Sequence, residues 1–512
     1  MSMPFIDAEF TFTQPDGSPL QVRGTGNQHQ ARFETLDGFT VVRDPATGYY
    51  EYAAPADSGA GLLASGVTVG AADPGAVGFA PGLRASETVM RAEAQATSNL
   101  PTGNTRWEQR RRARRDAQRL FATQSMVAPA GMALPAPPQR HTVGRFVGLT
   151  LLIDFSDQPA TIARDEVEAF CNEQGYSGFG NVGSVRDYFR DISDGKLEYS
   201  NIVAPYYRAR QPRSYYTNES VEQPRRAWEL IREALDHLAA SGFDGSVLSA
   251  DEQDHVYALN VFYAGKRVNN WAKGLWPHAY HLAEPYALAP GKNLYDYQIT
   301  DMTAELSLGT FCHENGHMIC DFPDLYDYGY QSSGAGKFCL MCSGGSGAAR
   351  EKNPTQVGAY LKHAAGWTSS ATTLAPGSVT LHAGRNDFAF HRKSDTEYFV
   401  IENRAASGRD AALDADGLAV WHVDEQGSNN HEQGTVNLHY ECALIQADGL
   451  RELENRINDG DHRDLFRAGH NDSFGHMTRP ESVWWNRSVS GLDILNISAA
   501  GPQMQFDVVE VE

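Results

Sequence analysis

Residues 313 to 317 read His-Glu-Asn-Gly-His, within a helical pattern that ends at a proline and several aspartates. Side chains four residues apart project from one face of a helix, so His313 and His317 are placed to bind one metal ion. Glu314 lies beside the first histidine, where a carboxylate takes a proton from a metal-bound water and passes it to a leaving amine. The spacing predicts half of a zinc site; the alternative is a surface helix with two unrelated histidines.

A catalytic zinc ion takes a third protein ligand, which must come from beyond this helix. Pro323 stops helical continuation, and carboxylates follow at Asp321, Asp324 and Asp327. Further along, Met341 lies in a Gly/Ser-rich turn region, where a methionine under the ligands would give the site an apolar floor. The residues alone leave the third ligand open among the three aspartates.

Composition indicates a globular protein of several units. The chain has 512 residues, which exceeds the size of one ordinary domain. Hydrophobic residues make up 41% of it and aromatic residues 10%, as is typical of a globular protein. We expect no membrane span, because no apolar run approaches the roughly 18 residues that a helical span needs. The formal charge of −21 argues against nucleic acid as a partner, because phosphates attract a basic surface. Oligomeric state is left open.

The order of the patterns predicts an α+β protein in which strands and helices alternate around a mixed sheet. Buried strands are expected near residues 146 and 255 to 265, and helices at 221 to 240 and 303 to 320. We expect four segments: an N-terminal β module at 1–55, a linker with an Arg-rich helix at 56–140, the mixed-sheet domain at 141–370, and a β-sandwich-like region at 371–512. Within the linker, residues 128 to 139 are rich in Ala and Pro.

Several longer stretches carry a family resemblance. "GSVRDYFRDISDGKL", "NPTQVGAYLKHAAGW", "DGLAVWHVDE" and "SGLDILNIS" occur in this order around the His-Glu-x-x-His motif. Together they are similar to the immune inhibitor A family of bacterial zinc metalloproteases, which belongs to the metzincin group. The resemblance implies a zinc-dependent endopeptidase that acts on protein or peptide substrates, with a metzincin-like catalytic domain and a Met-turn at Met341.

The same resemblance bears on processing and localisation. It implies that the N-terminal module is pro-like, so that the chain is a zymogen. It also implies an extracellular, secreted protein, although the opening residues "MSMPFIDAEFTF" show no secretory signal, and a cytoplasmic location is the alternative. No cysteine precedes Cys171, so a propeptide thiol cannot cap the zinc ion, and latency must use a carboxylate or obstruction.

The chain departs from the family pattern after the second histidine. Family members usually place Gly seven residues after the first His and Asp at ten, whereas Cys320 stands at seven and Asp324 at eleven. We expect the helix to run one residue longer and Asp321 to take the left-handed turn conformation usually filled by Gly, since Asp tolerates it better than most residues. Asp324 then becomes the third ligand, ahead of Asp327 and Asp321; a Glu ligand such as Glu351 would signify a different group of zinc proteases. The shift also supports an alternative, a catalytically inactive protease-fold protein that acts as a protein-binding module.

The arginine run at 110–115 has two interpretations: a solvated helix, or a cleavage site for activation between the N-terminal module and the enzyme core. A third interpretation, salt-sensitive DNA binding by residues 104 to 125, is disfavoured by the overall acidity.

Three further groups have both a functional and a structural interpretation. Four cysteines near the motif, Cys312, Cys320, Cys339 and Cys342, are read as buried thiols, with a disulfide or a second zinc site as alternatives. Asp459, Asp461 and Asp464 are spaced like calcium ligands or like a polar turn. Trp276 and His278 either border the substrate cleft or form an aromatic corner on the sheet.

Overall fold

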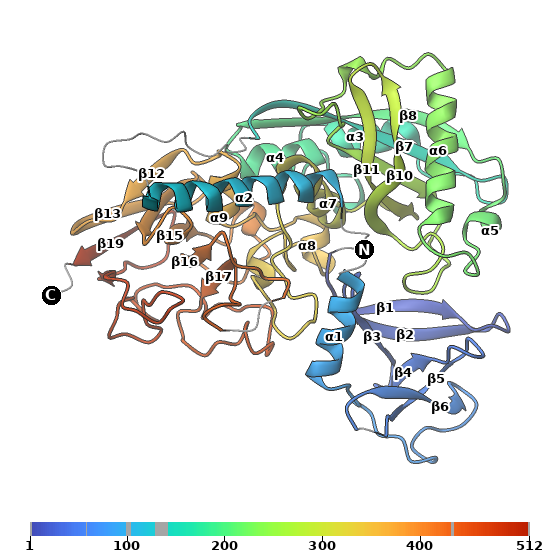
Figure 1. Ribbon diagram of the computed structural model, residues 1–512, viewed down its shortest axis with the longest axis horizontal. Coiled ribbons are helices and arrows are strands. Elements are labelled where there is room, and N and C mark those ends of the chain that lie inside the picture. The colour runs from blue at the N-terminus through green and yellow to red at the C-terminus, as the bar shows by residue number, and fades with distance from the viewer. Residues whose placement is uncertain (1–2, 58, 99–103, 128–141, 432–434, 510–512) are drawn as a thin grey trace.

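The computed structural model describes residues 3–57, 59–98, 104–127, 142–431 and 435–509 (Figure 1). Within these ranges it has four β-sheets with helices packed on the central one, so the predicted α+β class is confirmed at that level. The Ala/Pro segment at 128 to 139 lies outside the described residues. None of the described helices combines the length and the apolar character that a membrane crossing requires.

The N-terminal sheet is a six-stranded meander in which each strand pairs with the next. Its strands are β1 (Phe5–Thr13), β2 (Pro19–Gly26), β3 (Ala31–Thr35), β4 (Thr40–Arg43), β5 (Tyr50–Pro55) and β6 (Leu62–Thr68). The sheet therefore extends past the expected end of the module at residue 55. Phe10, Phe12 and Phe33 form its core because alternate side chains of a strand face the same side.

The central sheet is mixed, in the order β10-β11-β9-β7-β8. Its strands are β7 (Gly144–Asp154), β8 (Leu197–Arg208), β9 (Leu259–Ala264), β10 (His278–Ala289) and β11 (Lys292–Met302), and only the β10–β11 pair is antiparallel. Along β7, Leu152 faces one core cluster while Leu151 and Ile153 face another. Both faces are thus covered, which explains the continuous apolar run in this strand.

Helices cover the two faces of the central sheet. One face carries α3 (Arg164–Asn172), α4 (Val185–Ile192) and α7 (Leu308–Cys320), and the other carries α6 (Arg225–Ala240). The strands expected near 146 and 255 to 265 and the helix at 221 to 240 are confirmed. The motif helix begins at Leu308, later than the expected residue 303.

The C-terminal region consists of two sheets. The five-stranded sheet contains β12 (Ser370–Thr373), β14 (Asp387–Arg392), β15 (Glu397–Arg404), β16 (Gly417–Asp424) and β17 (Cys442–Ile445). The three-stranded sheet contains β13 (Gly377–His382), β18 (Asp493–Leu495) and β19 (Gln503–Val509). Phe399 and Val420 of the first sheet share one apolar cluster with Phe506 of the second, so side chains of both sheets form a common core.

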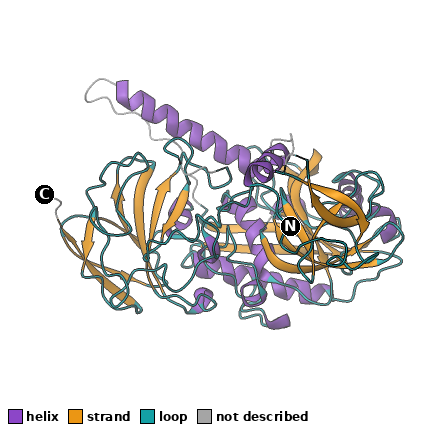
Figure 2. Ribbon diagram, turned by 90° about the horizontal axis from the view of Figure 1, so that it is seen from below, coloured by secondary structure: helices purple, strands orange, loops and turns teal. Residues whose placement is uncertain are grey.

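The remaining helices connect these parts. They are α1 (Glu87–Ser98), α2 (Arg106–Val127), α5 (Arg213–Tyr216), α8 (Ala348–Lys352) and α9 (Ala359–Ala364). The short 3-10 turns are η1 (Gly178–Gly180), η2 (Gly245–Val247), η3 (Gly336–Phe338) and η4 (Gly408–Asp410). Helix α2 starts beside α7 and runs along the surface toward the C-terminal sheets (Figures 1 and 2). This long helix covers the side of α7 that carries His317 and Met318.

Candidate metal centre

Helix α7 ends in a sharp reversal of the chain. Asp321 follows its last residue with φ 54° and ψ 31°, a left-handed conformation, and its N–H donates to the carbonyl of His317 at 2.9 Å. The expectation that Asp321 takes this conformation is confirmed. The reversal brings the following residues back along the face of α7 that carries the two histidines.

Three potential ligand atoms converge next to this reversal. Nε2 of His313 lies 3.1 Å from Oδ1 of Asp324, Nε2 of His317 lies 3.2 Å from the same oxygen, and the two Nε2 atoms are 3.2 Å apart. A tetrahedral zinc ion with bonds of about 2.0–2.1 Å separates its ligand atoms by about 3.3–3.4 Å. The observed triangle is therefore close to one face of a zinc tetrahedron, with a fourth direction left for water or substrate. Among the described residues, this is the one group of His, Cys, Asp or Glu side chains assembled for a metal ion.

The backbone orients both imidazoles. Nδ1 of His313 donates to the carbonyl of Leu340 at 2.9 Å, and Nδ1 of His317 donates to the carbonyl of Phe322 at 2.6 Å. A carbonyl only accepts hydrogen bonds, so both Nδ1 atoms carry hydrogen and Nε2 is the atom left for a metal. Ligating histidines usually have such a partner on their second nitrogen. The residues thus fit zinc.

The other candidate ligands have different roles. Asp321 forms ion pairs with Arg110 and Arg114 of α2 at 2.6 and 2.7 Å. The carboxylate of Asp327 accepts backbone N–H groups of its own loop, among them that of Gly329 at 2.9 Å. The structure brings neither these two residues nor Glu351 into the ligand group.

Electrostatics tie the three ligand residues together. Burial lowers the pKa of His317, but the charge and hydrogen bond of Asp324 outweigh it and raise the pKa to about 9. Burial raises the pKa of Asp324, yet the two imidazoles hold it well below its ordinary value. The carboxylate is therefore the charged partner of the two rings, which is the state in which it binds a cation.

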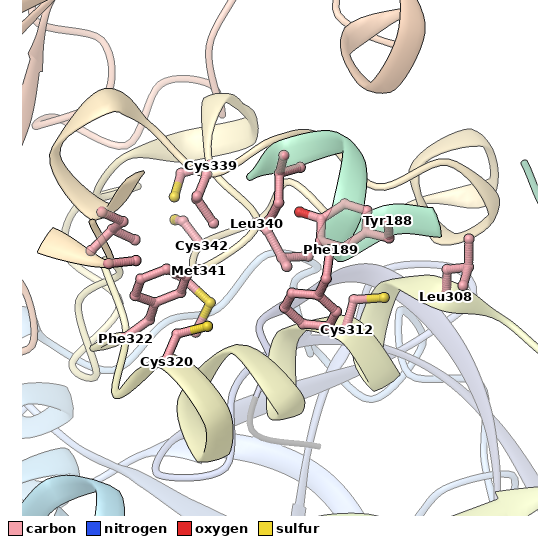
Figure 3. Close-up of a cluster of buried hydrophobic side chains, with 14 of the residues drawn as sticks. Tyr188, Phe189, Leu308, Cys312, Cys320, Phe322, Cys339, Leu340, Met341 and Cys342 are labelled. Atoms are coloured by element: carbon pink, nitrogen blue, oxygen red, sulfur yellow. The ribbon is translucent and has the colours of Figure 1, made fainter. Parts of the chain in front are cut away.

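Met341 forms part of the floor of this centre. It is fully buried, and a Cβ added at Gly316, between the two histidines, would lie 2.9 Å from its sulfur atom. Figure 3 shows Met341 with Cys320 and Phe322 against α7. Met341 therefore gives the centre an apolar floor, as expected from the sequence.

Glu314 is buried at 2% exposure and lines a cavity of about 680 Å³ together with His317 and Asp324. Burial raises the pKa of the Glu314 carboxyl above its ordinary value. The same cavity is lined by His278, whereas Trp276 packs on Phe10 and Phe12 of the N-terminal sheet. Of this pair, then, the histidine faces the cleft and the tryptophan is a packing residue.

Sequence reasoning missed two supports of the centre. Tyr328 donates from its hydroxyl to Oδ2 of Asp324 at 2.9 Å, which fixes the carboxylate from the side away from the rings. Asn315 is fully buried and joins α7 to the sheet through Asn260 at 2.9 Å and Tyr199 at 2.6 Å. The only feature of the sequence that could have indicated a structural role for Asn315 is its position inside the motif.

One face of the arginine-rich helix α2 packs on the site. Trp107 stacks on His317, with ring centroids 4.5 Å apart. The side chains of Arg110 and Arg111 are 12% and 19% exposed. The interpretation of a solvated helix is therefore wrong for the face of α2 that carries these arginines, because carboxylates far along the chain hold them, whereas Arg112 is exposed.

The remaining predicted groups are placed as follows. All six cysteines are buried free thiols, as expected, so no disulfide ties Cys339 or Cys342 to the cysteines of α7. The predicted calcium ligands are dispersed over other partners: Asp459 pairs with Arg350 at 3.1 Å, and Asp461 pairs with Arg463 at 2.6 Å. They do not form a ligand group among the described residues.

Comparison with known proteins adds no assignment: no protein-family model matches the chain, and no curated protein matches it.

Proposed function

We propose that the chain is a zinc-dependent endopeptidase with a metzincin-like catalytic domain. The observation that carries the proposal is the convergence of two imidazole nitrogens and one carboxylate oxygen within 3.2 Å of one another beside a buried glutamate. His313, His317 and Asp324 would hold the ion. The left-handed turn at Asp321 and the methionine floor at Met341 are consistent with a metzincin arrangement.

When bound, zinc supplies a Lewis acid that polarises a scissile carbonyl and lowers the pKa of water to about 7. Glu314 acts as general base, taking the proton of the attacking water, and then as general acid, delivering it to the leaving amine. Both roles need a carboxylate at the rim of the cleft, and Glu314 lines the cavity that a substrate would enter. His313 and His317 stay in one tautomer throughout because backbone carbonyls hold their Nδ1–H groups.

The structure also supports the zymogen interpretation. Helix α2 covers the front of the centre, and Trp107 lies on the ring of His317. A peptide substrate needs that space, so we propose that α2 must move away or be cleaved before catalysis. Secretion is consistent with such a latent form.

The direct test compares the parent protein with Glu314→Gln, both loaded with zinc and proteolytically activated. We expect the variant to keep about one zinc ion per chain after dialysis and to lose about 10²–10⁴-fold in peptide hydrolysis. Near-normal turnover in the variant would reject the mechanism. A well-folded parent protein that retains no zinc would instead favour the inactive binding module.

A further inference from the structure

Five arginines of α2 are seated on carboxylates that belong to other parts of the chain. The seats are built by Asp251, which follows η2, by Asp321 at the end of α7, and by Glu441 next to β17. All three carboxylate side chains are at most 3% exposed. The arginines concerned are Arg106, Arg110, Arg111, Arg114 and Arg115.

The first seat surrounds the guanidinium of Arg110. Asp321 accepts from its Nε at 3.0 Å and from its Nη2 at 2.6 Å, and Asp251 accepts from its Nη1 at 3.0 Å. The carbonyl of Met318 accepts at 3.1 Å, and the ring of Tyr257 lies 5.0 Å from the guanidinium carbon. Carboxylates, a carbonyl and an aromatic face together match a planar group with several donors, which is the chemistry of arginine rather than of lysine.

The second seat is centred on Glu441. Both Arg111 and Arg115 pair with this carboxylate, and Arg115 also donates to the carbonyl of Gly427 at 2.7 Å. Tyr360 donates to the other oxygen of Glu441 at 2.6 Å and so fixes its orientation. This seat too supplies a buried charge and a backbone acceptor to a guanidinium.

Both seats are next to the candidate metal centre. Met318, whose carbonyl belongs to the first seat, follows His317 directly in the chain. Arg110 lies one helical turn after Trp107, the residue that stacks on the His317 ring. Arg111 and Arg115 of the second seat line the same cavity as Glu314. A peptide that reaches the centre must therefore lie along the surface that α2 covers.

We propose that, once α2 has left, these two seats are substrate subsites that bind arginine side chains, and that the protein favours peptides carrying several arginines around the cleaved bond. This substrate class rests on the proposed endopeptidase function, while the binding preference itself does not. Residues 251, 321 and 441 all lie outside α2, so the seats stay with the catalytic part when the helix moves. The net charge of −21 attracts such basic peptides to the protein.

Binding is measured on the full chain carrying Glu314→Gln, which prevents cleavage, together with glutamine at all five seated arginines and Trp107→Ala. These substitutions remove the ion pairs and the ring stack that hold α2 over the seats, and glutamine preserves helix propensity. The probes are two fluorescein-labelled peptides of identical sequence, one with four arginines and one with four citrullines, the neutral isostere. Fluorescence anisotropy should show the arginine peptide binding at least about tenfold tighter. Equal affinities, or no binding of either peptide, would overturn the proposal.

Two further substitutions assign the preference to the seats. Asp321→Asn removes a charge and keeps a residue that tolerates the left-handed conformation, and Glu441→Gln keeps an acceptor for Tyr360. Introduced together, they should reduce the difference between the two peptides to less than about threefold, as expected when the charged partners are lost. Asp461→Asn, which removes a carboxylate that pairs with Arg463 elsewhere, is the matched control and should leave the difference unchanged. A preference that survives the loss of both seat charges would contradict the assignment.

If the variant with five glutamines lacks the circular dichroism of the parent, Arg110→Gln with Arg111→Gln frees one position in each seat and carries the same comparison. The outcome is also separable from the proposed function. If the protein hydrolyses peptides but shows no arginine preference, the subsite proposal alone is contradicted. If it shows the preference but hydrolyses no peptide, the endopeptidase function alone is contradicted.

Discussion

The indole of Trp107 lies on the imidazole of His317, with an interplanar angle of 20° and ring centroids 4.5 Å apart. The two residues are 210 positions apart in the chain, and their contact joins the N-terminal helix α2 to the candidate metal centre. Access to the centre is therefore coupled to the position of α2.

Trp107→Ala should raise the peptidase activity of the unprocessed, zinc-loaded protein. An aromatic stack is worth about 0.5–1.5 kcal/mol beyond its buried area, so the displaced state should gain roughly tenfold in population when the area is lost as well. The measurement is the initial rate on a quenched fluorescent peptide before any cleavage of the chain. Trp107→Phe keeps a stacking ring and should behave like the parent, and a rate unchanged by the alanine substitution would show that α2 does not limit access.

Asp324→Asn should abolish stable zinc binding, whereas Asp327→Asn should keep it. Of these two residues, Asp324 has an oxygen within 3.2 Å of both imidazole nitrogens, while Asp327 accepts backbone N–H groups of its loop. Metal content after dialysis, by atomic absorption, distinguishes the two variants. The reverse result, zinc lost with Asp327 and kept with Asp324, would move the third ligand to Asp327.

Gly309→Ala should destabilise the protein by about 3 kcal/mol, because overpacking of a buried contact costs this order when backbone is the obstacle. A Cβ at Gly309 would meet the carbonyl oxygen of Gly345 at 2.2 Å, so α7 would have to move away from the segment that follows Met341. Chemical denaturation measures the change. Gly61→Ala is the control: its nearest neighbour would be the Cβ of Ala56 at 3.7 Å, an ordinary contact, and the free energy of unfolding should change by less than about 0.5 kcal/mol.

Protonation of His278 should contribute to acid destabilisation. Burial lowers its pKa from 6.5 to about 4, and its ring bonds the carbonyl of Trp276 at 2.7 Å and the hydroxyl of Tyr297 at 2.9 Å. Between pH 6.5 and about 4, His278 binds a proton in the unfolded chain but not in the folded protein. The stability contributed by the neutral ring is therefore complete above pH 6.5 and is lost as the pH falls toward 4. Since the ring is partly exposed, the loss should be about 1–3 kcal/mol.

The measurement for His278 is the free energy of unfolding between pH 7 and pH 4 for the parent and for His278→Gln. The variant removes the titrating group, so its stability should fall less steeply over this range. Parallel curves for the two proteins would show that His278 does not titrate differently in the folded state.

The motif helix and the side chains that converge beside it could be predicted because their determinants are local. A spacing of four residues fixes the two imidazoles on one face, Pro323 ends the helix, and the tolerance of Asp321 for left-handed angles follows from its short polar side chain. The preference for Asp324 over Asp321 and Asp327 as third ligand depends on the prediction of that left-handed turn.

The docking of α2 could not be predicted, for a physical reason. A run of arginines in a sequence shows charge but not its partners, and here the partners at Asp251, Asp321 and Glu441 lie more than 130 residues away. The network of Asn315, Asn260 and Tyr199 was missed for the same reason: its members come from α7 and two strands of the central sheet. The sequence of strand β6, "LLASGVT", predicts linker rather than strand because its alternation of apolar and polar residues is weak.

The hydrogen bonds from His313 and His317 to main-chain carbonyls have one more consequence. Because the peptide backbone holds each ring, the ligand triangle does not depend on an ion for its shape. Removal of the proposed zinc ion by a chelator should therefore leave the protein folded and able to bind zinc again, unlike small domains that unfold when their metal is withdrawn.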